Sequence, residues 1–163
     1  MFSNGVNVRK SIEDQLIFGH VDISKIKFDL KSRDEIPSVL QGLQSIYMNE
    51  DLRKQIFEIL ETKILPNSNK RNGRPGMNLW KILVLGILRV NLNWDYDKLH
   101  EMINNHIRIR QLLGHTIFDN DYTYNLQTLK DNINLLTPEL INEINEKVVR
   151  FAHSIVKKKP KKL

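Results

Sequence analysis

From residue 34 onward, hydrophobic residues recur three and four positions apart, which is the spacing of one face of an α-helix. A first helix is predicted with Ser32 or Asp34 as its cap and Pro37 in its first turn. A second helix is predicted to begin after the cap residue Asn49. The hydrophobic faces of these two helices are formed by Val39, Leu40, Leu43, Ile46 and Tyr47, and by Leu52, Ile56, Ile59 and Leu60.

The N-terminal arm, residues 1–33, lacks this helical spacing and is predicted to be irregular. Within it, residues 26–30 alternate between hydrophobic and polar, a period that is typical of extended backbone. This stretch favours either one short strand or an extended segment that lies on the core.

The sharpest break in the helical pattern lies at residues 66–76, which are polar, basic and rich in turn-forming residues. Such a composition predicts an exposed loop. Residues 77–92 then follow and are hydrophobic on nearly every side, which predicts a central helix buried by its neighbours. Asn78, Lys81 and Arg89 give this helix only a narrow polar stripe.

Further helical segments follow the central helix. Asp95 can cap one that carries Leu99 and Ile103 on its inner face, and Gly114 is suited to ending a short helical turn after it. Residues 119–121 are predicted to open another helix. The inner face of that helix would consist of Tyr122, Leu126, Leu129 and Ile133.

The last predicted helix begins at Thr137-Pro138-Glu139, a capping residue followed by a first-turn proline and an acid, and it runs to about Lys157. The whole pattern predicts an all-α fold, a compact bundle of about six or seven helices with a helix-turn-helix-like DNA-binding unit. We expect the irregular arm at 1–33, one helical domain at 34–156 and a basic tail at 157–163.

Basic charge is segregated along the chain. The formal net charge is +6, but five of the 25 Lys and Arg residues lie in the tail, so residues 1–156 carry 20 basic against 19 acidic groups. Residues 62–94 nevertheless hold six basic residues and no Asp or Glu. Such segregation indicates a polyanionic partner. The six are Lys63, Lys70, Arg71, Arg74, Lys81 and Arg89.

Several classes of site are excluded or disfavoured. The chain has no cysteine, no phosphate-binding glycine motif and no nucleophile elbow, which leaves no thiolate chemistry and no recognisable nucleotide loop. His100-Glu101 and His106 resemble a zinc helix, but their spacing of six turns the two rings apart, so we expect no metal. No signal peptide and no membrane span is visible, which favours a soluble protein of the cytoplasm.

The basic loop is the first candidate for DNA binding. In Lys70-Arg71-Asn72-Gly73-Arg74-Pro75, an arginine precedes a proline and follows a glycine, as in the core of an AT-hook. Such arms place arginine in the narrow minor groove of A·T-rich DNA. The alternative is a plain basic loop in which Pro75 starts the next helix.

The polar face of the helix predicted after residue 121 is the second candidate. Gln and Asn can pair with adenine and Thr can contact a thymine methyl, while Arg108 and Arg110 could hold phosphates. Two points count against this interpretation: the carboxylate of Asp131 would be repelled by the DNA backbone, and any amphipathic helix has a polar face. The candidate base-reading residues are Tyr124, Asn125, Gln127 and Thr128, with Asn132 beside them.

Read together, these segments resemble the N-terminal, InsH-like region of insertion-sequence transposases of the IS-five and ISNCY groups. The resemblance covers essentially the whole chain and rests on the order and spacing of several segments. They are FGHVDISKIKFDLKSRDEIPSVLQGLQSIY at 18–47, ETKILPNS at 61–68, Gly73-Arg74-Pro75-Gly76-Met77, LWKILVLGILRVNLNWDYDKLHE, RQLLGH at 110–115, YNLQTLKDN at 124–132, and LLTPELINEIN at 135–145, running on to KKKP at 157–160.

The resemblance implies a DNA-binding part that recognises the terminal inverted repeats of its own element, in a prokaryotic, nucleoid-associated protein. In this family an RNase H-like domain with an acidic triad and magnesium follows the lysine-proline stretch. No catalytic position therefore carries over to this chain, and no cofactor is expected here. We expect an isolated or frameshifted N-terminal part, truncated before the catalytic domain and inactive by itself.

A protein-interaction module is the alternative function, for example a dimerisation unit that inhibits the full-length transposase. The last predicted helix carries a heptad-like series that would suit the seam of a homodimer. The same series could equally pack on the domain's own core. Its members are Ile141, Ile144, Val148, Phe151 and Ile155.

Overall fold

The computed structural model describes residues 19–64, 76–119 and 121–158, apart from the side chains of 155–158. In these residues it contains seven α-helices and no strand, so the predicted all-α class is confirmed for this part of the chain. The α-helices are α1 (Ile36–Met48), α2 (Glu50–Ile64), α3 (Leu79–Asn91), α4 (Tyr96–Asn105), α5 (Ile107–Leu112), α6 (Leu126–Ile133) and α7 (Pro138–Lys158), and the short 3-10 helices are η1 (Ile23–Lys25) and η3 (Ile117–Asp119).

Most of the predicted helix starts are confirmed by capping hydrogen bonds. The side chain of Asn49 accepts from the backbone N–H of Leu52 at 2.9 Å, and Asp95 does the same for Lys98 at 2.7 Å. Thr137 Oγ1 accepts from the N–H of Leu140 at 3.2 Å and caps α7. These side chains satisfy N–H groups that have no partner within the first helical turn, and each such cap contributes about 1 kcal/mol.

Of the N-terminal arm, residues 19–33 are described; the segment around η1 lies on α1, and these residues form no strand. Residues 23–25 form η1, and Ile26, which follows with extended backbone, is buried together with Ile23. The amide of Gln44 on α1 donates to the carbonyls of Ile23 and Ile26, both at 2.8 Å. Of the two predicted alternatives for residues 26–30, the segment lying on the core is therefore confirmed.

The start of α6 was predicted too early. The helix does not begin at residues 119–121 but at Leu126, because Asn125 accepts from the N–H groups of Gln127 and Thr128 and caps it there. Asp119 instead ends η3, where its carboxylate accepts from the N–H of Thr116. Tyr122 precedes the helix and is 51% exposed, so its predicted place on the inner face is wrong.

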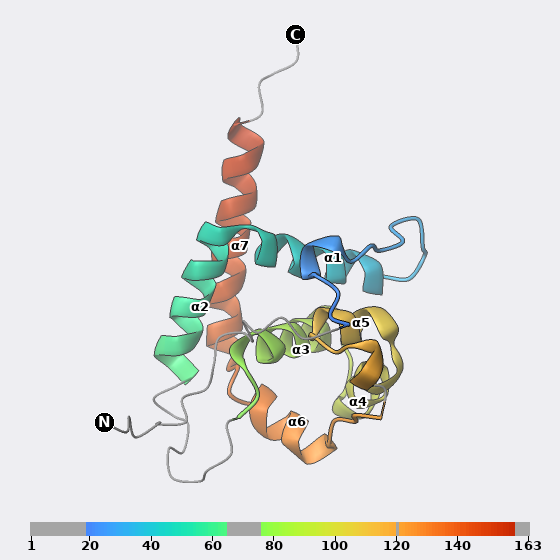
Figure 1. Ribbon diagram of the computed structural model, residues 1–163. Coiled ribbons are helices and arrows are strands. Elements are labelled where there is room, and N and C mark those ends of the chain that lie inside the picture. The colour runs from blue at the N-terminus through green and yellow to red at the C-terminus, as the bar shows by residue number, and fades with distance from the viewer. Residues whose placement is uncertain (1–18, 65–75, 120, 159–163) are drawn as a thin grey trace, which may run out of the picture.

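α3 is the centre of the fold, as predicted from its uniformly hydrophobic sequence. It contacts α1, α2, α4 and α6, and Figure 1 shows it crossing the middle of the molecule. The indole N–H of Trp80 donates to the carbonyl of Leu112 at 2.8 Å, which ties α3 to the end of α5. Among the described helices, none has the length and hydrophobicity that a membrane span requires.

α2 and α7 run antiparallel along one side of the bundle, and the C-terminal part of α7 extends beyond α2 (Figure 1). Of the heptad-like series in α7, Ile144 is buried, and Ile141, Val148 and Phe151 are partly buried against the core. The side chain of Ile155 lies outside the described residues. The described members of the series are therefore used for packing within the chain.

Two helical glycines provide a matched test of this packing. Gly86 in α3 is buried, and an added Cβ would overlap Leu136 Cδ1, whereas an added Cβ at the exposed Gly42 in α1 would meet nothing within 4 Å. Gly42→Ala is therefore expected to raise the free energy of unfolding by about 1 kcal/mol through helix propensity. Gly86→Ala is expected to lower it by about 1–2 kcal/mol, because overpacking outweighs that gain. Urea denaturation measures both changes, and equal stabilisation by the two variants would contradict the packing at Gly86.

Candidate nucleic-acid interface

The N-terminus of α6 is positioned by side chains of α4. The side chain of Asn104 accepts from the backbone N–H of Tyr124 at 2.7 Å, and its amide donates to the Tyr124 carbonyl at 3.4 Å. His100 Nε2 also lies 2.7 Å from this carbonyl and donates to it. Since Tyr124 immediately precedes the cap residue Asn125, these contacts fix where α6 begins and how it is oriented.

The exposed face of α6 consists of Gln127, Thr128 and Asp131. The amide of Gln127 donates to the carboxylate of Asp131 at 2.8 Å, so the two side chains lie along one side of the helix. On the opposite side, Leu129 and Ile133 are buried and α6 packs against α3 and α4. α6 thus presents a short polar surface on a rigid support.

Two other residues of this candidate face are engaged inside the structure. Asn125 is exposed, but its side-chain oxygen caps α6. Asn132 is buried, and its amide donates to the carbonyl of Thr128 at 2.7 Å. Gln127 and Thr128 are therefore the two predicted base-reading side chains that both face outward and take no part in holding the fold.

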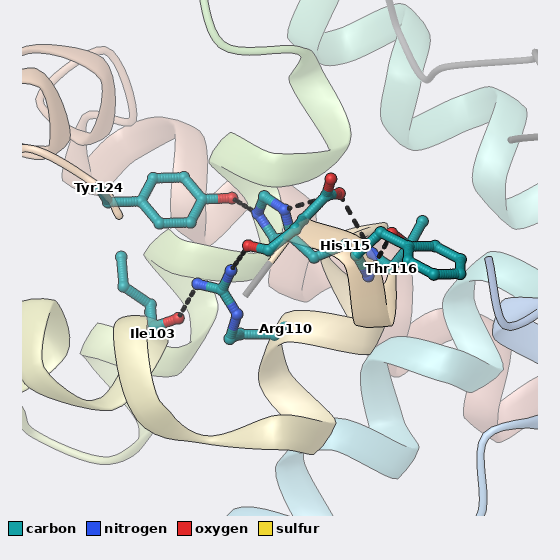
Figure 2. Close-up of polar contacts among 7 residues, drawn as sticks. Ile103, Arg110, His115, Thr116 and Tyr124 are labelled. Carbon is teal, nitrogen blue, oxygen red and sulfur yellow. Dashed lines mark hydrogen bonds and ion pairs between the residues drawn. The ribbon is translucent and has the colours of Figure 1, made fainter. Parts of the chain in front are cut away.

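Arg110 was predicted to hold a phosphate, and the structure contradicts this. The residue is only 8% exposed. Its guanidinium donates to the carbonyl of Asp119 at 2.8 Å and to that of Ile103 at 3.5 Å (Figure 2). Arg110 therefore joins the η3 segment to the end of α4, and its guanidinium is used within the fold.

Tyr124 was predicted to read bases, and it is also buried, with 4% of its surface exposed. Its hydroxyl lies 2.5 Å from His115 Nε2, and Figure 2 shows its side chain directed at the imidazole. The other imidazole nitrogen, Nδ1, lies 3.7 Å from a carboxylate oxygen of Asp119. Tyr122 stacks on His115 with ring centroids 5.1 Å apart. The rings of this cluster therefore pack against one another within the segment that connects α5 to α6.

Burial determines the protonation states in this cluster. Desolvation, together with the positive charges of Lys81 and Arg110, lowers the pKa of His115 to about 4. Burial also raises the pKa of Tyr124 far above its ordinary value. At neutral pH the imidazole is therefore uncharged, and its Nε2 accepts a hydrogen bond from the tyrosine hydroxyl. A buried hydroxyl with a raised pKa is not an activated nucleophile, so the carboxylate, imidazole and phenol form a structural support for α6.

The remaining predicted cations are not on α6: one lies on α5, and the others belong to the basic loop, outside the described residues. Arg108 on α5 is exposed and donates to the side-chain oxygen of Gln111 at 3.0 Å, so it remains accessible to a phosphate. α5 contacts α1 and α4, whereas α6 contacts α3 and α4, so the two helices pack on different neighbours of α4. Lys70, Arg71 and Arg74 of the basic loop lie outside the described residues.

A basic cluster next to α6 was not predicted as a site. The guanidinium carbon of Arg89 lies 4.2 Å from the ring centroid of Tyr96, and Lys130 Nζ lies 5.8 Å from the same centroid. The sequence indicated only that Arg89 belongs to the polar stripe of the central helix. No local signal relates it to Lys130, because the two residues meet only through the packing of α3, α4 and α6.

Comparison of the chain with models of known protein families, with curated proteins and with solved structures found no match.

Proposed function

We propose that this chain binds double-stranded DNA through the exposed face of α6, as the DNA-recognition part of an insertion-sequence transposase. The observation that supports the proposal is the placement of Gln127 and Thr128, exposed side by side on a helix whose opposite face is anchored to α3 and α4. An α-helix supported in this way fits the major groove of B-DNA, which admits one helix.

The chemistry of the two side chains suits base recognition. A glutamine amide pairs with the N6 and N7 atoms of adenine, and a threonine methyl contacts the methyl of thymine. In the unbound chain the Gln127 amide is bonded to Asp131, so binding requires this amide to turn towards the base. The exposed cation Arg108 and the basic loop are the proposed phosphate contacts.

The resemblance to the N-terminal region of IS-five and ISNCY transposases indicates which DNA the chain would bind. In that family the corresponding region recognises the terminal inverted repeats of the element. The proposal therefore places this chain in end recognition, the step that precedes strand cleavage. Magnesium and the acidic triad belong to the family's catalytic domain and have no assigned position among these residues.

The decisive experiment selects preferred sites from a library of random duplexes and then measures affinity by fluorescence anisotropy. Wild-type protein is expected to enrich a defined site and to bind it with a log–log salt slope of about −0.9 per phosphate contacted. Gln127→Ala is expected to reduce discrimination at one base position by roughly tenfold, since a bidentate contact contributes about 1–3 kcal/mol.

Gln55→Ala is the matched control, because Gln55 is an equally exposed glutamine on α2. It is expected to leave both affinity and discrimination unchanged. Enrichment of no site, or an identical preference in wild-type and Gln127→Ala protein, would contradict recognition by α6.

A further inference from the structure

We infer that Arg89, Tyr96 and Lys130 form a binding site for a phosphate of the DNA backbone, next to the exposed face of α6. The inference rests on the proposed function and adds to it the residues that fix the position of α6 on the duplex. Backbone contacts of this kind set the register of a DNA-binding helix, while base contacts set its specificity.

Three helices bring the site together. Arg89 lies in the last turn of α3, Tyr96 is the first residue of α4, and Lys130 is on α6 between the exposed Thr128 and Asp131. Both positive charges lie within 5.8 Å of the Tyr96 ring centre. The tyrosine hydroxyl donates to the side-chain oxygen of Asn134 at 2.8 Å, which holds the ring against the end of α6.

Three other basic side chains of the fold form ion pairs with acids. Lys54, Lys98 and Arg150 each pair with a glutamate on their own helix, at 3.0, 3.2 and 3.9 Å. Arg89 and Lys130 form no ion pair with any of the described residues.

Two acids next to the site in sequence, Asp95 and Asp131, accept hydrogen bonds from other groups. Asp95 accepts from the backbone N–H of Lys98, and Asp131 accepts from the amide of Gln127. The ring quadrupole of Tyr96 attracts each cation but carries no net charge. Two cations therefore lie around one ring without an ion-pair partner among the described residues, an arrangement that can receive an anion.

The guanidinium of Arg89 lies over the Tyr96 ring and is partly buried. Its Nε is buried and donates to no acceptor among the described residues, while its Cζ lies 4.2 Å from the centroid of the Tyr96 ring. A fixed guanidinium loses little conformational freedom on binding, and its terminal N–H groups match the oxygens of a phosphate. Lys130, half-buried beside the polar face of α6, supplies a second point charge.

The competing interpretation is that the stack only joins three helices. A purely structural role predicts that loss of the charges lowers stability but leaves DNA affinity and its salt dependence unchanged. Replacement of the charges by amides of similar length therefore separates the two interpretations. Binding and its salt dependence, and not only stability, are the quantities to measure.

The test compares the double variant Arg89→Gln/Lys130→Gln and the single variant Lys130→Gln with wild type on duplex DNA. The double variant is expected to bind every sequence roughly tenfold more weakly, with unchanged preference among sequences. Its log–log salt slope is expected to be shallower by about 0.9, the value for one phosphate. Lys54→Gln on α2, which removes an exposed cation remote in sequence from the site, is the control that should leave the slope unchanged.

If wild-type protein binds DNA and the charge variants bind it with the same affinity and slope, the phosphate site is wrong while the proposed function stands. If wild-type protein binds no DNA, the proposed function fails, and the site is then tested with inorganic phosphate at constant ionic strength. A saturable NMR shift of the Arg89 Nε–H resonance that is lost in Lys130→Gln would support the site. No such shift would overturn it.

Discussion

Acidification from pH 6.5 to about pH 4 is expected to lower the free energy of unfolding by about 3 kcal/mol, because the folded chain resists protonation of His115. Burial lowers the pKa of this imidazole from 6.5 to about 4 in the folded chain, whereas the unfolded chain retains the ordinary value. Between these values the unfolded chain binds the extra proton, so stability is complete above pH 6.5 and is lost as the pH falls. Burial lowers the pKa of His106 as well, which adds to the loss.

Urea denaturation at a series of pH values measures this effect, and the ring-proton NMR shifts of His115 give its folded-state pKa directly. His115→Gln is the control, because an amide oxygen can still accept the hydroxyl of Tyr124 but does not titrate. The variant is expected to show a much flatter pH dependence between pH 4 and 6.5. An equally steep dependence in wild type and variant would place the titrating group elsewhere.

Arg110→Met is expected to lower the free energy of unfolding by about 3 kcal/mol, because it removes the donors from the backbone carbonyls of Ile103 and Asp119. Methionine keeps the unbranched side chain and a good helix propensity, so the loss reports the guanidinium. Thermal or chemical denaturation measures it.

Arg108→Met is the matched variant two residues earlier on the same short helix. Since Arg108 is exposed and bonded only to the side chain of Gln111, its replacement should change stability by no more than about 0.5 kcal/mol while weakening DNA binding. Similar stability losses in the two variants would contradict the different roles that burial assigns to them.

The two binding proposals assign base preference and backbone contact to different residues. Gln127 is expected to determine which base is preferred, and Arg89 with Lys130 to determine affinity and salt dependence without sequence preference. His115, Tyr124 and Arg110 are buried and are not part of the proposed contact surface. They act through the orientation of α6, since Tyr124 immediately precedes the cap of that helix.

Three helix starts that depend on neighbouring residues were predicted correctly, whereas the cap predicted for α1, Ser32 or Asp34, was wrong because Glu35 occupies that position without a side-chain hydrogen bond. Asn49, Asp95 and Thr137 cap their helices as the sequence indicated, because each cap bonds an N–H only three residues ahead. The start of α6 was missed because two local signals competed. Asp119 and Asn125 can each cap a helix, and the choice follows from contacts of Tyr124 with α4, some 20 residues away.

The sequence alone determined the all-α class, the central place of residues 79–91 and most helix boundaries, because hydrophobic spacing and capping act within one or two turns. The tertiary structure decided which polar side chains reach solvent. Arg110 and Tyr124 look like surface residues by type but are buried where α4, η3 and α6 meet. Arg89 and Lys130 lie far apart in sequence and converge on one ring. Burial and convergence arise from packing between helices, which no local pattern of residues encodes.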